Sequence, residues 1–133
     1  GTPGPRATTQ TFTITVTDDD TPASSAAREF KIVVPVTILT TTLPAAHVGT
    51  AYDEALAGAG GLPFQTDAGA AYYHWSLGAG LSLPDGLTLD PNTGVIAGTP
   101  TLAATTQTLT VTVTDNDSPA TTESKEFTLT VTP

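Results

Sequence analysis

Residues 7–23 read ATTQTFTITVTDDDTPA, and residues 104–120 read ATTQTLTVTVTDNDSPA. Both belong to a longer match, in which residues 1–34 align without a gap with residues 98–131 and 19 of the 34 pairs are identical. Self-similarity at a fixed spacing, here 97 residues, is typical of repeat proteins. We therefore interpret residues 1–34 as the closing part of one unit and residues 36–133 as a complete next unit.

The repeated stretch has the pattern of a β-hairpin. In residues 108–114, leucine and valine alternate with threonine, so the aliphatic side chains share one face of a strand and the hydroxyls share the other. The acidic turn at residues 115–119 ends this strand, and alternation resumes at residues 126–131. Residues 10–17 and 28–34 repeat the same pair of strands.

The segment between the two hairpins predicts further short strands. Turn sequences, LPDG at residues 83–86 and DPNTG at residues 90–94, separate short apolar runs. No segment of ten or more residues has a helical period. The expected strands are residues 36–39, 52–56, 72–77, 87–89 and 95–97.

About seven short strands with a central tryptophan predict an all-β fold, a two-sheet antiparallel β-sandwich preceded by a β-hairpin from the preceding repeat. The apolar faces of the strands need a common interior. The residues expected to point inward are Tyr73, Trp75, Leu89, Ile96, Leu109, Val111, Val113, Phe127 and Leu129.

Composition excludes several classes of function. Thirteen acidic residues against four basic ones give a net charge of −9, which argues against nucleic acid and anionic membrane surfaces as partners. The chain has no cysteine, so it has no disulfide and no thiolate metal site. No apolar run is long enough to insert into a membrane. Because the sequence begins at Gly1 and lacks methionine, we expect a processed product or a piece of a longer protein.

No catalytic constellation stands out, and we predict that the chain is not an enzyme. His47 and His74 are the only histidines, and serine, threonine and aspartate are scattered along the whole chain, so the sequence singles out no Ser-His-Asp triad. Tyr52 and Trp75 have the ring faces that sugars stack on, but aromatic residues on a sandwich strand more often belong to the core. A carbohydrate-binding accessory module of a secreted enzyme is therefore kept as an alternative function.

The motifs of the complete unit resemble a known family, the putative immunoglobulin repeat (He_PIG) of bacterial and archaeal surface proteins, and are remotely similar to cadherin-like repeats. The resemblance covers residues 43–131. Its motifs are LP at 43–44, VGTAY at 48–52, GG at 60–61, YHWSL at 73–77, LPDGLTL at 83–89, TGVIAGTP at 93–100 and the closing VTD strand at 113–115.

The resemblance implies an immunoglobulin-like sandwich that occurs in tandem in secreted or surface-attached proteins, and it implies no shared chemistry. We therefore expect an extracellular or cell-surface location and a non-catalytic structural or adhesive role, in a stalk, adhesin or fibre. The expected partners are neighbouring repeats or identical subunits, bound through residues 7–34, and a cell-surface protein or glycan.

Calcium is the one metal that the sequence favours. Asp18 and Asp20, and likewise Asp115 and Asp117, place carboxylates on a tight loop, and Ca²⁺ prefers such oxygen ligands. The resemblance to cadherin-like repeats adds that these use an aspartate after the corresponding strand at calcium sites between domains.

Two departures from the cadherin pattern count against calcium. The junction at residues 34–38 reads VPVTI and has no carboxylate, and GTP at residues 98–100 replaces the motif that carries a glutamate in cadherins. An Asp-Asn-Asp-Ser-Pro loop is also ordinary turn chemistry without any metal.

The first hairpin lacks the other strands of its own unit. A two-stranded hairpin with one apolar face is marginally stable in water, so we expect something to cover it. In a tandem array the covering strands lie just upstream. In the alternative, the hairpin completes the sandwich of another subunit by strand exchange, and repetition of this contact builds a filament.

Overall fold

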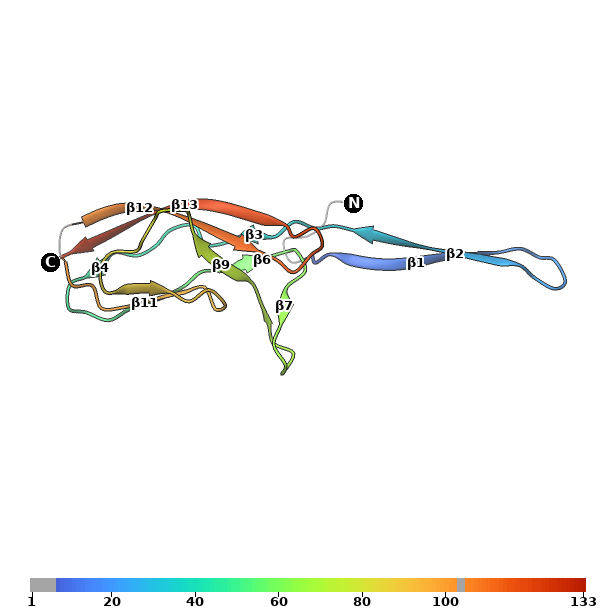
Figure 1. The fold of residues 1–133 in the computed structure, drawn as a ribbon, viewed down its shortest axis with the longest axis horizontal. Helices are drawn as coiled ribbons and strands as arrows, with labels where there is room; N and C mark the ends of the chain where they lie inside the picture. The colour runs from blue at the N-terminus through green and yellow to red at the C-terminus, as the bar shows by residue number, and fades with distance from the viewer. Residues whose placement is uncertain (1–6, 103–104) are drawn as a thin grey trace.

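The computed structural model describes residues 7–102 and 105–133. Residues 1–6, where the alignment of the two repeats begins, lie outside the described part. Figure 1 shows an elongated molecule with a sandwich at one end and a hairpin projecting from the other. β-Strands are the regular secondary structure of the described residues, and no helix among them is long and apolar enough to cross a membrane.

Two sheets form the sandwich and confirm the predicted all-β, immunoglobulin-like fold. Within each sheet the neighbouring strands are antiparallel, except that β4 runs parallel to β13. The first sheet has the order β4 (Ala46–His47), β13 (Thr122–Thr132), β12 (Thr105–Thr114) and β9 (His74–Leu77), and the second has the order β10 (Leu87–Leu89), β11 (Val95–Gly98) and β5 (Tyr52–Ala55).

Short strand pairs extend the sandwich at its edges. β3 (Thr37–Ile38) pairs with β6 (Gly58–Ala59), and β7 (Phe64–Gln65) pairs with β8 (Ala71–Tyr72). The predicted strand at residues 72–77 is wrong in extent, because it is divided at Tyr73. Tyr72 belongs to β8 and pairs with Phe64 of β7, whereas β9 pairs with β12 in the first sheet. Strands β4, β6 and β7 were not expected from the sequence.

One core lies between the two sheets. Of the nine residues predicted to point inward, seven are buried, and Tyr73 and Leu89 are partly buried against them. Ile96, Leu109, Val111, Val113 and Leu129 have no exposed surface. The predicted core is therefore confirmed. Val36, Ile38, Ala46, Tyr52, Leu56, Leu83, Leu87 and Val131 complete it.

The projecting hairpin consists of β1 (Gln10–Thr17) and β2 (Ser25–Ile32). It has the same register as β12 and β13: Phe12 lies opposite Phe30, as Leu109 lies opposite Phe127. The environments differ. Phe12 and Phe30 are each 41% exposed, whereas Leu109 is 0% and Phe127 is 3% exposed. The same strand pairing thus occurs once with a covering sheet and once without.

Leu129 and Ile32 occupy equivalent positions and allow a matched test. Leu129 is fully buried, so Leu129→Ala should lower the free energy of unfolding of the sandwich by about 2–5 kcal/mol. Ile32 is 53% exposed, and Ile32→Ala should cost less than about 1 kcal/mol. Urea unfolding of both variants measures the difference. Equal costs would mean that the hairpin face is covered in solution.

Candidate functional site at the hairpin junction

The base of the hairpin is hydrogen-bonded to the sandwich through backbone groups. The Thr9 N–H donates to the Gly61 carbonyl over 3.0 Å, and the Gly61 N–H donates to the Val34 carbonyl over 2.9 Å. Gly61 has a φ of +59°, and a Cβ at this position would lie 2.4 Å from Oδ2 of Asp115. Only glycine therefore permits this close approach of three segments.

Asp115 is buried at the centre of the junction, with 1% of its surface exposed. Its carboxylate accepts four hydrogen bonds. The donors are the backbone N–H groups of Leu62 (3.1 Å), Asp117 (3.2 Å) and Thr121 (2.7 Å), and the Thr121 hydroxyl (2.7 Å). A buried charge is tolerated when its hydrogen-bonding capacity is satisfied, and the chain itself satisfies this one.

Asp117 links the sandwich to the base of the hairpin, where β1 begins and β2 ends. Its buried carboxylate accepts hydrogen bonds from the Lys31 ammonium, from the Thr9 hydroxyl over 2.8 Å and from the Ser118 N–H over 2.9 Å. The hydrogen bond from Lys31 lowers the pKa of the Asp117 carboxyl below its ordinary value, and those from Thr9 and Ser118 lower it further, against an opposing effect of desolvation.

The charge of Asp115 also acts on a neighbouring tyrosine. The Tyr73 hydroxyl donates to the Gly60 carbonyl over 2.8 Å, next to the junction. Burial raises the pKa of this phenol, and the negative charge of Asp115 raises it further. Tyr73 therefore stays protonated and remains a hydrogen-bond donor at neutral pH.

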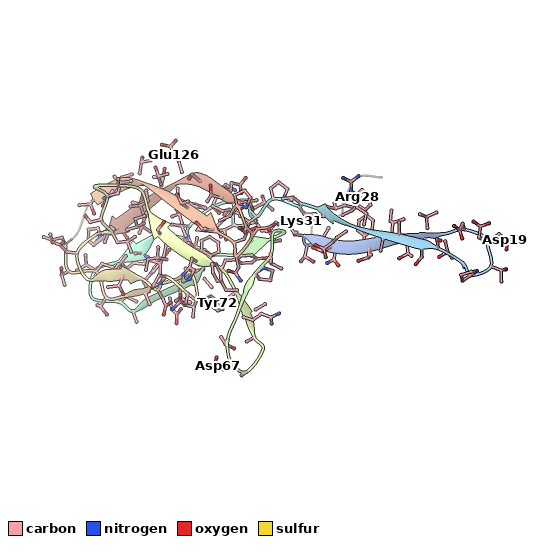
Figure 2. The ribbon with its side chains drawn as sticks, turned by 45° about the vertical axis from the view of Figure 1, so that its right-hand side comes forward. Asp19, Arg28, Lys31, Asp67, Tyr72 and Glu126 are labelled. Carbon is pink, nitrogen blue, oxygen red and sulfur yellow. The ribbon has the colours of Figure 1, made fainter. Side chains whose placement is uncertain are left out.

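Asp18 and Asp20 lie in the loop at the far end of the hairpin, where Figure 2 labels Asp19. This loop has the same hydrogen bonds as the equivalent loop at Asp115. Oδ1 of Asp18 accepts hydrogen bonds from the N–H groups of Ser24 (2.7 Å) and Asp20 (3.3 Å). The loop is exposed, whereas its counterpart at Asp115 is buried. The four predicted calcium ligands therefore form two separate pairs.

The two acidic loops differ in how well they fit calcium, which takes six to eight oxygen ligands. At the junction, the carboxylate of Asp115 already accepts four hydrogen bonds from the chain, and the carboxylate of Asp117 is paired with Lys31. Ca²⁺ would therefore have to displace an ammonium group. Within residues 7–102 and 105–133, no group of three or more Asp, Glu, His or Cys side chains is arranged to hold a metal ion. Calcium binding stays a prediction of the sequence.

Lys31 and Thr9 were not among the predicted site residues. They lie 86 and 108 residues from Asp117 in the chain, so no local motif connects them. The repeat alignment does point to Lys31 as an unusual residue. Lys31 aligns with Thr128, so a lysine stands where the complete unit has an exposed strand threonine.

The fold and these motifs agree with the comparison with known families. The model of He_PIG, described as "Putative Ig domain", matches residues 34–132. The chain belongs to this family. A search of curated proteins found no match.

Solved structures similar to this He_PIG chain include several protocadherins. Protocadherin gamma B2 extracellular cadherin domains 3–6 give a TM-score of 0.52 at 18% identity, covering 94% of this chain and 33% of the solved one. Protocadherin gamma C5 EC1–3 gives 0.51 at 17%, covering 92% and 43%. The protocadherin gammaB7 EC3–6 cis-dimer structure gives 0.50 at 16%, covering 92% and 32%. The chain spans less than half of these proteins, and the likeness establishes the fold.

The ion pair predicts how the stability of the junction depends on pH. Because the folded-state pKa of Asp117 is lowered, its contribution is fully present above the ordinary Asp pKa of about 3.9 and is lost as the pH falls through the lowered value. Asp117→Asn should therefore lower the melting temperature at neutral pH, and the difference from wild type should shrink below about pH 4. Thermal unfolding across pH measures it. A difference that is independent of pH contradicts the assignment.

Calcium binding is tested by calorimetric titration of the wild type with millimolar Ca²⁺. Binding at the hairpin tip predicts heat that persists in Asp117→Asn and disappears in the double variant Asp18→Asn/Asp20→Asn. Binding at the junction predicts the reverse, together with a higher melting temperature. The absence of both heat and a melting-temperature change in the wild type would contradict the calcium prediction at both loops.

Proposed function

We propose that this He_PIG unit is a non-catalytic structural or adhesive repeat of an extracellular surface protein, a stalk, adhesin or fibre in which such units follow one another. The observation that carries the proposal is the second copy of the closing hairpin. Residues 1–34 align with residues 98–131, and β1 and β2 pair in the register of β12 and β13. A tandem array accounts for both.

The exposed face of the hairpin supports an array. Phe12, Ile14, Val16, Phe30 and Ile32 are between 41% and 67% exposed, whereas the equivalent residues of the complete unit are buried beneath strands β5, β10 and β11. Strands of the same kind, supplied by the unit to which the hairpin belongs, would remove this apolar surface from water. Residues 1–34 are then the end of a preceding repeat.

The junction supports a role in spacing. Backbone hydrogen bonds at Gly61 and the side-chain bonds of Asp117 tie the hairpin to the sandwich at several points. A linker fixed in this way holds two units in one relative orientation, and stacked repeats whose units contact only their neighbours form extended structures. Such a rod presents whatever it carries at a distance from its attachment point.

The surroundings of the two histidines support a non-catalytic role. Nδ1 of His47 is hydrogen-bonded to the Thr132 hydroxyl over 2.6 Å, and the His74 ring packs edge-on against Phe64, with 4.4 Å between ring centroids. Neither contact includes an acidic partner that would orient the imidazole for catalysis. The extracellular location is supported by the fold likeness to extracellular cadherin domains and by the He_PIG resemblance.

Strand exchange is the second candidate, because the same exposed hairpin face fits a second copy of the chain. In this arrangement the β1–β2 hairpin of one subunit is covered by another subunit, and head-to-tail repetition gives a filament. One similar solved structure, of protocadherin gammaB7 EC3–6, is a cis-dimer, so dimer contacts occur on this fold.

Light scattering combined with limited proteolysis separates these two functions. The array predicts that the 133-residue chain is a monomer whose hairpin is cut at low protease concentration. It also predicts that a chain extended upstream by one natural unit resists cleavage there. Strand exchange predicts dimers or fibres with a protected hairpin, which disperse when residues 1–34 are deleted. A monomer whose hairpin resists protease contradicts both.

A further inference from the structure

A cleft of about 340 Å³ lies on the side of the sandwich, between the β7–β8 hairpin and the turn at residues 90–94. This volume is within the range of about 300–1,000 Å³ that is typical of small-molecule sites. Figure 2 shows Tyr72 where the β7–β8 hairpin leaves the sandwich and Asp67 near its tip. Neither the junction carboxylates nor the apolar residues of the β1–β2 hairpin are among the described residues that line the cleft.

Aromatic rings form the wall and the floor of this cleft. Tyr73 and Trp75 line it from the core side, and Tyr72 is half-buried at its edge. Tyr72 is held in place by two further rings: it stacks on Phe64 with 5.5 Å between centroids and meets His74 edge-on at 5.6 Å. The ring of Tyr72 is therefore positioned before any ligand arrives.

The opposite side of the cleft is a turn of defined shape. Oδ1 of Asp90 accepts hydrogen bonds from the backbone N–H groups of Asn92 (2.8 Å) and Thr93 (2.9 Å). Gly94 has a φ of +72°, and a Cβ there would lie 2.7 Å from Nε1 of Trp75, so the turn packs directly on the indole. Asn92 and Thr93 line the cleft from this turn.

The polar groups of the cleft are uncharged. Its described lining residues include no Asp, Glu, Lys, Arg or His. Thr66 Oγ1 accepts a hydrogen bond from the Ala70 N–H over 3.1 Å, which leaves its hydroxyl proton available for a ligand. The exposed side-chain amide of Asn92 offers a donor and an acceptor. The net charge of −9 repels an anionic ligand, and the described lining of the cleft offers no carboxylate to pair with a cationic one, so a neutral ligand fits the cleft best.

We propose that this cleft binds a neutral saccharide. One face of a sugar ring consists of C–H groups, which pack on the negative face of an aromatic ring such as Tyr72. The edge of the ring carries hydroxyls, which require the uncharged donors and acceptors that Asn92 and Thr66 provide. This function goes beyond the spacing role and adds glycan adhesion to it.

The test uses the labelled 133-residue chain on an array of neutral and sialylated glycans, followed by calorimetric titration with the strongest neutral glycan. We expect binding to neutral glycans only. Tyr72→Ala should weaken binding by about tenfold or more, because a central aromatic ring carries much of the affinity of such a site. Tyr72→Phe, which keeps the ring, should remain within about threefold of wild type.

Phe12→Ala is the matched control, because it removes an exposed aromatic ring far from the cleft. It should leave glycan binding unchanged. Asn92→Ala, in an exposed turn, keeps the proposal testable if Tyr72→Ala does not fold, and it should weaken binding several-fold. Circular dichroism and melting temperatures verify folding. The proposal is overturned by binding to no neutral glycan, by preference for sialylated glycans, or by equal losses in Tyr72→Ala and Phe12→Ala.

Discussion

The buried carboxylate of Asp115 holds together the end of the sandwich that faces the projecting hairpin. It accepts hydrogen bonds from the segment at Leu62 and from both sides of its own loop, at Asp117 and Thr121. A buried charge left without these donors would be costly, so the three backbone segments have one acceptable arrangement. Gly61 is part of the same constraint, because any side chain there would overlap the carboxylate.

The hydrogen bonds of Asp115 in turn hold Asp117 where its carboxylate can contact the base of the hairpin. In this loop the Asp117 carboxylate faces Lys31 and Thr9, and it forms an ion pair in which the carboxylate side chain is 1% exposed and the Lys31 side chain is 35% exposed. Fully exposed ion pairs contribute little, but removing Lys31 would leave the buried Asp117 carboxylate without its cation. The hairpin is therefore attached through specific polar contacts, while its apolar face remains exposed.

The strand around Trp75 serves two purposes because its side chains alternate. Tyr73 and Trp75 point toward the core, and the indole packs beneath the turn that contains Gly94. Tyr72 and His74 point outward and join Phe64 in a surface cluster. The core thus fixes the position of the proposed saccharide cleft, so the proposed spacing role and the proposed recognition surface depend on the same packed strand.

The sequence by itself determined the local structure and much of the fold. Alternation in residues 108–114 and 126–131 predicted the strands and the inward residues, since a period of two assigns side chains to faces without knowledge of the partner. Both Asp-x-Asp loops adopt the same hydrogen bonds, at Asp18 and at Asp115, although one is exposed and the other buried. Short-range hydrogen bonding of this kind is encoded locally.

Only the tertiary structure decided what each loop and ring contacts. Lys31 and Thr9 reach Asp117 across 86 and 108 residues, and Tyr72 leaves the predicted strand to pair with Phe64. Such contacts depend on how separate strands pack, and strand periodicity carries no information about distant partners. For the same reason, nearly identical hairpins have a buried face at Leu109 and an exposed face at Phe12: burial is a property of the covering sheet, which the hairpin sequence does not contain.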